Sequence, residues 1–190
     1  MKRFGIGMVI LGIMMITGAI GLLMQNREEE RVAARSVQAV MVQIESAQIS
    51  VPEEEMPEEM AAVAIDGRGY IGYLVIPVLE LELPVMDQWS YEGLKTAPCR
   101  YGGSVCTDDL VVMAHNYESH FGRLDELEPG DEVSFTDMAG VTRDYRVQTV
   151  EILESGDVAG MTAGEWELTL FTCTYGGKKR LAVRCGKVCG

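Results

Sequence analysis

Residues 167–184 read Glu-Leu-Thr-Leu-Phe-Thr-Cys-Thr-Tyr-Gly-Gly-Lys-Lys-Arg-Leu-Ala-Val-Arg. Two runs with alternating apolar residues, 167–172 and 180–184, flank the turn sequence Tyr-Gly-Gly-Lys, and this pattern predicts a β-hairpin. Pairing of the two strands would bring Cys173, at the end of the first, next to Arg180, at the start of the second. The segment therefore predicts a β-rich domain in which a thiol lies close to a permanent cation.

Further short strands separated by turn sequences precede the hairpin. We expect strands at 70–77, 81–87, 110–114, 131–137, 142–153, 167–172 and 179–184, and short helices at 91–95 and 120–127. Many short strands at such spacing are typical of a mostly β sandwich or barrel. The strands fall within about 120 residues, which is enough for one domain with a single core.

Cys173 is a candidate nucleophile. A thiol attacks a carbonyl as thiolate or when a base removes its proton, and an ordinary cysteine pKa of about 8.5 leaves little thiolate at neutral pH. The chain has two histidines, His115 and His120, and histidine is suited to carry a proton near neutral pH. His115 directly follows the apolar run 110–114, so a buried strand would deliver it to a strand end. We expect His120 instead to pack or cap at a helix start.

Arg180 is the candidate for oxyanion stabilisation. A guanidinium keeps its charge at any working pH and presents a planar fork of N–H donors to a developing negative charge. Cys173, His115 and Arg180 together supply a nucleophile, a proton carrier and a fixed cation, which are the parts of thiol acyl transfer.

Five segments in order make the chain resemble the sortases, the membrane-anchored cysteine transpeptidases of Gram-positive bacteria. They are Gly72–Pro77 with Leu81–Met86, Met113–Tyr117, His120–Leu124, Pro129–Val133 and Thr169–Cys173. The resemblance covers about residues 70–184 and implies the family's closed eight-stranded β-barrel with short helices. It also implies a short strand near 99–102 that propensity alone does not predict.

Carried over residue by residue, the family's nucleophile falls on Cys173, its histidine on His115 and its arginine on Arg180. Arg184 is the alternative for the arginine. The family's arginine directly precedes a short apolar strand, as Arg180 does here, whereas Arg184 follows it. Thr172, next to the nucleophile, is expected to have a supporting role in substrate binding.

The resemblance implies a transpeptidase that cleaves a Leu-Pro-x-Thr-Gly-like sorting signal between Thr and Gly through a thioacyl intermediate. His115 would protonate the departing amine, and Arg180 would stabilise the oxyanion or orient the substrate. The expected partners are surface proteins that bear the signal and an amine acceptor on a peptidoglycan precursor or a pilin. No cofactor is expected.

The expected class is D or a close relative, partly because the gap between Cys173 and Arg180 is short. The interval 153–165 is too short for the long inserted helix of class B enzymes. No N-terminal lid with an aspartate plug, typical of class C, is evident.

Two other functions are compatible with this composition. A secreted cell-wall cysteine peptidase would return an acid instead of an amide, but papain-like and related wall peptidases place cysteine before histidine. Here the histidine comes 58 residues before the cysteine. A non-catalytic, membrane-tethered binding barrel with a vestigial thiol is the second alternative.

The N-terminus predicts a membrane anchor. Phe4–Met24 is an uncharged run of 21 residues, about 31 Å long as a helix against a bilayer core of about 30 Å. Basic residues at 2–3 precede it and acidic residues at 28–30 follow, so we expect a single-pass cell-membrane protein with a cytoplasmic N-terminus and an extracellular catalytic domain. A cleaved signal peptide is the alternative, but the run exceeds the usual length of about 7–15 residues and no convincing cleavage site follows.

We expect three regions: cytoplasmic N-terminus and anchor at 1–24, an acidic stalk at 25–68 and the catalytic domain at 69–190. The stalk has ten acidic residues against four arginines and so supplies six of the 13 net negative charges. An acidic chain without a basic patch argues against nucleic acid as a partner.

The stalk is expected to be partly helical. Apolar residues recur at helical spacing within about 28–48, namely Val37, Val40, Met41 and Ile44. This stripe would pack on the domain or, alternatively, on a second copy of the chain. Residues 50–59, with two prolines, are expected to be extended or disordered.

Five cysteines follow the membrane run, so pairing leaves at least one thiol, and an unpaired exported thiol indicates reactivity. We expect Cys173 to be that thiol. Cys99 with Cys106 and Cys185 with Cys189 could each form a disulfide, and the sequence leaves both open. The Cys-x-x-x-Cys tail is not a usual zinc pattern, and no loop has enough well-spaced carboxylates to predict a calcium site.

Overall fold

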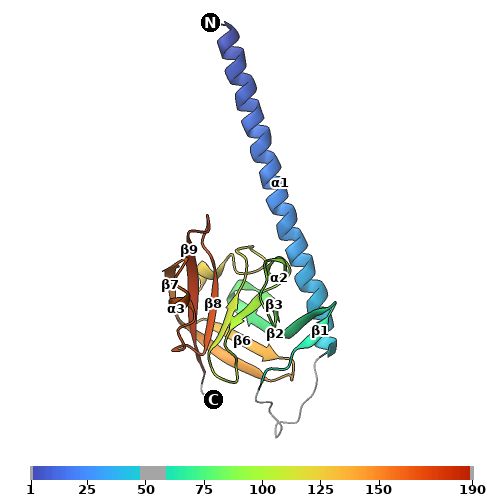
Figure 1. The fold of residues 1–190 in the computed structure, drawn as a ribbon, viewed down its shortest axis with the longest axis vertical. Helices are drawn as coiled ribbons and strands as arrows, with labels where there is room; N and C mark the ends of the chain where they lie inside the picture. The colour runs from blue at the N-terminus through green and yellow to red at the C-terminus, as the bar shows by residue number, and fades with distance from the viewer. Residues whose placement is uncertain (1, 48–58, 189–190) are drawn as a thin grey trace.

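The computed structural model describes residues 2–47 and 59–188. A long N-terminal helix packs beside a β-barrel and projects far beyond one end of it (Figure 1). The elements are α1 (Lys2–Ala47), β1 (Val63–Ile65), β2 (Arg68–Ile76), η2 (Pro77–Leu79), β3 (Leu81–Met86), α2 (Tyr91–Leu94), β4 (Cys99–Gly102), β5 (Leu110–Met113), η3 (Leu124–Glu126), β6 (Glu132–Asp137), β7 (Thr142–Glu154), α3 (Val158–Met161), β8 (Leu168–Cys173) and β9 (Lys179–Lys187).

The sheet closes on itself. Its strand order is β2-β3-β4-β5-β8-β9-β7-β6, and β6 pairs back with β2 between Gly72 and Val75. β1 is attached outside this ring, antiparallel to the start of β2. The β3–β4 and β5–β8 pairs are parallel and the others antiparallel. The expected closed eight-stranded barrel is confirmed, including the short strand at 99–102.

The two strands of the hairpin are buried on both faces. Leu170 of β8 and Val183 of β9 belong to the main core inside the barrel. Phe171 and Ala182, at the intervening positions, are buried in a smaller cluster on the outer face. Side chains along a strand point alternately to opposite faces, so this pattern fixes which residues of β8 and β9 face outward.

Gly72 allows β2 and β6 to approach each other. Its φ is 149°, and a Cβ at this position would meet the Thr136 carbonyl oxygen at 2.1 Å. Glycine accepts both the dihedral angle and the close approach of another backbone. The pairing that closes the barrel therefore depends on this residue.

α1 is one continuous helix that includes both the expected anchor and the expected helical part of the stalk. By length and composition, it contains a stretch able to cross a membrane. Further along, the stripe of Val37, Val40, Met41 and Ile44 is buried in the main core. The stripe therefore packs on the domain and not on a second copy.

The structure differs from the expectations at two places. β1 lies within the range expected to be stalk, because its apolar Val-Ala-Ile sequence pairs with the start of β2. The helix expected at 120–127 is reduced to η3, since the N–H groups of His120 and Gly122 both donate to the Tyr117 carbonyl and close a tight loop instead of a helical ladder. The expected helix near 91–95 is present as α2. Most of the extended segment expected at 50–59 lies outside the described residues.

Candidate active site

Strand pairing brings Cys173 and Arg180 together. Cys173 is the last residue of β8 and lies directly opposite Arg180 in the antiparallel β8–β9 pair. Directly opposed residues project from the same face of a sheet, with Cβ atoms about 5 Å apart. The predicted hairpin thus exists and makes Cys173 and Arg180 cross-strand neighbours.

His115 reaches the same place through the parallel pairing of β5 with β8. That pairing ends at Met113 opposite Phe171, and the Ala114 N–H extends it by donating to the Phe171 carbonyl at 3.2 Å. The same register, if it continued for two residues beyond Met113, would bring His115 toward Cys173. Two parallel strands that end side by side therefore lead to the predicted nucleophile and the predicted proton carrier.

Thr172 ties these two strand ends together. Its side chain is buried, and its Oγ1 donates to the Ala114 carbonyl at 2.9 Å. Because neighbours on a strand alternate, an inward Thr172 leaves Cys173 on the outer face, where it is half-buried. This bond thus joins the residues that directly precede His115 and Cys173.

The surroundings of His115 favour its neutral form. Burial lowers its pKa below the ordinary 6.5, the Lys95 ammonium lowers it further, and the Glu29 carboxylate on α1 opposes both. The imidazole packs against the Tyr117 ring, with centroids 5.0 Å apart. A neutral imidazole at pH 7 can accept a proton from a thiol or an amine.

His120 has a different environment. It is completely buried, and its ring packs near the Tyr117 ring with centroids 5.5 Å apart. Burial lowers its pKa to about 4. A histidine held neutral in the core serves packing, which is the role expected from its place in the sequence.

Arg180 lies at the base of the hairpin turn. It is half-buried, and its Nη1 donates to the carbonyls of Gly177 at 3.2 Å and Lys179 at 3.1 Å. Within the part of the chain that the structure describes, no hydrogen bond joins Arg180, His115 and Cys173. Catalytic hydrogen bonds often form only once substrate binds.

Arg184, the alternative to Arg180, is only 2 % exposed. Its donors reach Glu151 Oε1 at 2.7 Å, Thr169 Oγ1 at 3.1 Å, the Met161 carbonyl at 3.3 Å and the Gly160 carbonyl at 2.6 Å. Two of these acceptors belong to α3, in the connection between β7 and β8. Arg184 therefore fastens this connection to the barrel, which leaves Arg180 as the arginine beside Cys173.

Cys173 also differs from the buried cysteines. Burial raises the pKa of Cys99 to about 11 and that of Cys185 to about 12. Among the described residues both carry free thiols, so the Cys99–Cys106 bridge is not formed. Cys189 itself lies outside the described residues. Cys173 is an unbridged thiol that reaches the outer face of the barrel.

A cavity of about 280 Å³ borders Cys173. Asn116, which follows His115, and Asp125, in η3, contribute polar groups to its lining, and Ile152 contributes apolar surface. The sequence analysis missed all three residues. No motif marks them, because they lie near Cys173 only once the segment after β5 and the strand β7 pack against the end of β8.

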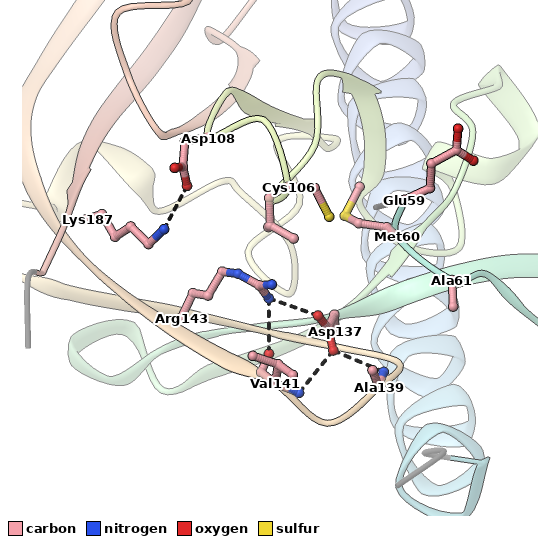
Figure 2. A pocket seen from close by; sticks show the side chains of 11 residues that line it. Glu59, Met60, Ala61, Cys106, Asp108, Asp137, Ala139, Val141, Arg143 and Lys187 are labelled. Atoms are coloured by element: carbon pink, nitrogen blue, oxygen red, sulfur yellow. Dashed lines mark hydrogen bonds and ion pairs between the residues drawn. The ribbon is translucent and has the colours of Figure 1, made fainter. Parts of the chain in front are cut away.

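A second cavity, of about 380 Å³, lies at the opposite end of the barrel, near the start of β5 and the end of β9 (Figure 2). Two cations border it, and both have carboxylate partners. Arg143 pairs with Asp137 at 2.8 Å and Lys187 with Asp108 at 2.9 Å. Neither Cys173 nor His115 nor Arg180 lines it, so it is separate from the predicted catalytic residues.

Comparisons with known proteins agree with this arrangement. Residues 74–188, more than half of the chain, match the family model described as Sortase domain. No curated protein matches the chain.

Solved structures similar to the chain include three streptococcal enzymes. Sortase C1 from Streptococcus agalactiae is 28% identical with a TM-score of 0.56 and covers 67% of this chain and 72% of its own. SortaseC1 from Streptococcus suis is 26% identical with a TM-score of 0.54 and covers 64% and 74%. Sortase C from Streptococcus pneumoniae is 22% identical with a TM-score of 0.59 and covers 86% and 90%.

These three structures are described as sortase C, so the expectation of class D finds no support among them. That expectation rested on the short 153–165 interval, on the short gap between Cys173 and Arg180 and on the lack of an evident N-terminal lid. The family match, at residues 74–188, includes β8, which ends at Cys173, and both neighbouring strands, β5 and β9. The chain therefore belongs to the sortase family of cysteine transpeptidases.

Proposed function

We propose that the protein cleaves a Leu-Pro-x-Thr-Gly-like sorting signal between Thr and Gly and transfers the acyl part to an amine. The observation that supports this proposal is the pairing of Cys173 with Arg180 across β8 and β9, together with the β5–β8 register, which leads toward His115 two residues beyond Met113. A nucleophile, a proton carrier and a permanent cation at one place are sufficient for acyl transfer through a thioester.

The first half-reaction forms the thioester. Neutral His115 takes the thiol proton as the Cys173 sulfur attacks the threonine carbonyl carbon, and the Arg180 guanidinium stabilises the resulting oxyanion. The C–N bond then breaks, and the imidazolium gives its proton to the departing glycine amine. The threonine remains bound to sulfur.

The second half-reaction returns the thiol. An acceptor amine attacks the thioester carbonyl, His115 takes a proton from the attacking nitrogen, and that proton goes back to the leaving sulfur. A new amide is released. Arg180 stabilises the second oxyanion as it did the first.

The cavity beside Cys173 is the proposed route for the acceptor. An amine is an ammonium ion in water at neutral pH, so the Asp125 carboxylate at the cavity would attract it before it loses a proton. The pneumococcal sortase C structure concerns pilin substrate specificity. A pilin lysine and an amine of a peptidoglycan precursor are the two acceptor classes to be tested.

The anchor would place the enzyme among its substrates. If α1 spans the cell membrane with its N-terminus in the cytoplasm, the catalytic domain is extracellular and shares a surface layer with membrane-held proteins. Confinement to one layer raises the effective concentration of such substrates.

The decisive experiment compares the native chain with Cys173→Ala on a library of sorting-signal peptides, with several amines, read by mass spectrometry. We expect the native chain to yield amide products and a trapped thioester, and Cys173→Ala to yield neither. Cys185→Ala, which removes a buried thiol, is the control and should keep activity. Acid products with every amine would indicate a peptidase, and no cleavage of any peptide by the native chain would reject the proposal.

A further inference from the structure

α1 passes close to the loop that carries His115. Glu30, half-buried, lies one turn before Ala33, where the buried face of the helix begins. Its neighbour Glu29 acts electrostatically on His115. The helix that enters the membrane-spanning stretch thus runs alongside the proposed active site.

Glu30 makes a two-point contact with this loop. Its Oε2 accepts a hydrogen bond from the Glu118 N–H at 3.1 Å, and its Oε1 accepts one from the Ser119 N–H at 2.7 Å. The bonds join residues 88 and 89 positions apart in sequence. Hydrogen bonds to a charged acceptor are roughly twice as strong as neutral ones.

Three further N–H groups of the loop are bonded within it. The N–H groups of His120 and Gly122 donate to the Tyr117 carbonyl at 2.9 and 2.8 Å, and that of Phe121 donates to the His115 carbonyl at 3.1 Å. Glu118 and Ser119 are the outer turn of the loop, and a residue of α1 supplies their acceptor. The loop is therefore closed by its own backbone on one side and by Glu30 on the other.

Gly122 makes the loop tight. A Cβ at this position would lie 2.7 Å from the carbonyl oxygens of Asn116 and Tyr117. Because the backbone of this loop is so tightly packed, a shift of Glu118 and Ser119 would also move the Tyr117 ring. The His115 imidazole packs against that ring and would move with it.

We propose that Glu30 is a positioning residue that holds the loop after β5 against α1 and so fixes the His115 imidazole relative to Cys173. This inference rests on the proposed role of His115. It makes the juxtamembrane helix part of the active-site scaffold, and it links the anchor mechanically to catalysis.

The same contact sets the distance of the site from the membrane. Glu30 lies six residues beyond Met24, the end of the uncharged run, which is about 9 Å along a helix. The active-site end of the barrel points toward the N-terminal part of α1 (Figure 1). In this proposal, Glu30 therefore holds the loop after β5 just above the membrane surface, where a membrane-held substrate presents its signal.

The test uses the full chain in detergent micelles or nanodiscs with Glu30→Ala, Glu30→Gln and the matched control Glu28→Gln, whose carboxylate faces the exposed Arg31 instead. We expect Glu30→Ala to lower kcat for peptide cleavage about tenfold with little change in KM, because a small misplacement of a catalytic group slows chemistry more than binding. Glu30→Gln keeps an oxygen acceptor and should fall in between. Glu28→Gln should behave as the native chain.

Hydrogen exchange of residues 116–122 provides a readout that needs no substrate. Loss of Glu30 should speed exchange at Glu118 and Ser119 while melting of the barrel stays unchanged. Unchanged exchange in Glu30→Ala overturns the clamp. Faster exchange with unchanged kcat overturns its positioning role. If the native chain cleaves no peptide, the proposed function fails, and exchange alone then decides whether the clamp exists.

Discussion

The protonation of His115 depends on its neighbours. Burial and Lys95 lower its pKa, and Glu29 raises it. These neighbours come from α1 and the end of α2, so two separate elements set the protonation of one imidazole. The pH at which the enzyme loses activity should therefore respond to substitutions away from the catalytic residues.

Replacing Lys95 with methionine tests this electrostatic effect. Removal of the ammonium should raise the pKa of His115 toward its ordinary value. Because the neutral imidazole is the active form, the acid limb of kcat/KM, expected below pH 6.5 in the native enzyme, should move to higher pH. The measurement is kcat/KM for one peptide between about pH 4.5 and 8.

The control for this series is Lys187→Met, which removes a lysine at the opposite end of the barrel. Its acid limb should coincide with that of the native enzyme. An acid limb that stays in place in Lys95→Met, or moves equally in both variants, would contradict the assignment of His115 as the titrating base.

Asp125 is predicted to act on the acceptor and not on the sorting signal. Asp125→Asn removes the charge at the cavity beside Cys173, so the KM for an amine acceptor should rise about fivefold while hydrolysis of the peptide is unchanged. The matched control is Glu126→Gln, because the adjacent Glu126 pairs with Arg123 at 2.9 Å and does not line the cavity. Equal effects of the two variants on acceptor KM would argue against an acceptor site here.

At the scale of elements, the two arginines of β9 divide two tasks. Arg180 lies opposite Cys173 at the end of the pair, and Arg184 fastens α3 through its buried guanidinium. Four residues apart on one strand, both face outward. They differ in burial: half-buried Arg180 is the catalytic candidate, and fully buried Arg184 is a structural residue.

Methionine substitutions should separate these tasks. Arg184→Met leaves the α3 carbonyls and Glu151 without their donor, so the free energy of unfolding should fall by about 3 kcal/mol in urea titrations. Arg180→Met should leave the free energy of unfolding nearly unchanged and reduce kcat about a hundredfold, as loss of an oxyanion donor does. Strong destabilisation by Arg180→Met and none by Arg184→Met would reverse the assignment.

At the scale of the whole molecule, α1 combines a stretch that is able to cross a membrane with turns that pack on the barrel. Its last turns place Ala33, Val37, Val40, Met41 and Ile44 in buried positions. Burial of an apolar side chain stabilises a fold by about 1.5–3 kcal/mol. The boundary between the candidate membrane span and the packed turns therefore lies within one continuous helix.

Two truncations test where that boundary falls. Deletion of residues 2–26 removes the uncharged run but keeps the buried turns and Glu30, so the soluble product should melt like the native barrel. Deletion of residues 2–47 exposes the core beneath the helix and should lower the free energy of unfolding by about 4 kcal/mol, since part of the burial energy is offset by the entropy of ordering the helix. Equal melting temperatures, measured by circular dichroism, would show that the helix does not stabilise the barrel.

Local patterns in the sequence determined the hairpin at 167–184, the strands of the barrel and the uncharged run at 4–24, because strand alternation, turn residues and apolar length are read within a few residues of one another. The resemblance added β4, which has little strand propensity of its own. Cys173 and Arg180 could be paired from sequence because a single hairpin turn joins the two strands that carry them.

Only the tertiary structure decided the contacts between distant segments. It showed that Arg184 is buried against α3, that Thr172 bonds the Ala114 carbonyl, that Asp125 shares a cavity with Cys173 and that Glu30 binds the loop after His115. Glu30 belongs to a run of charged residues that looks from sequence like a solvated stalk. Its role depends on the path of a helix across a barrel end, and such a path follows from the packing of the whole chain, which no short stretch of sequence encodes.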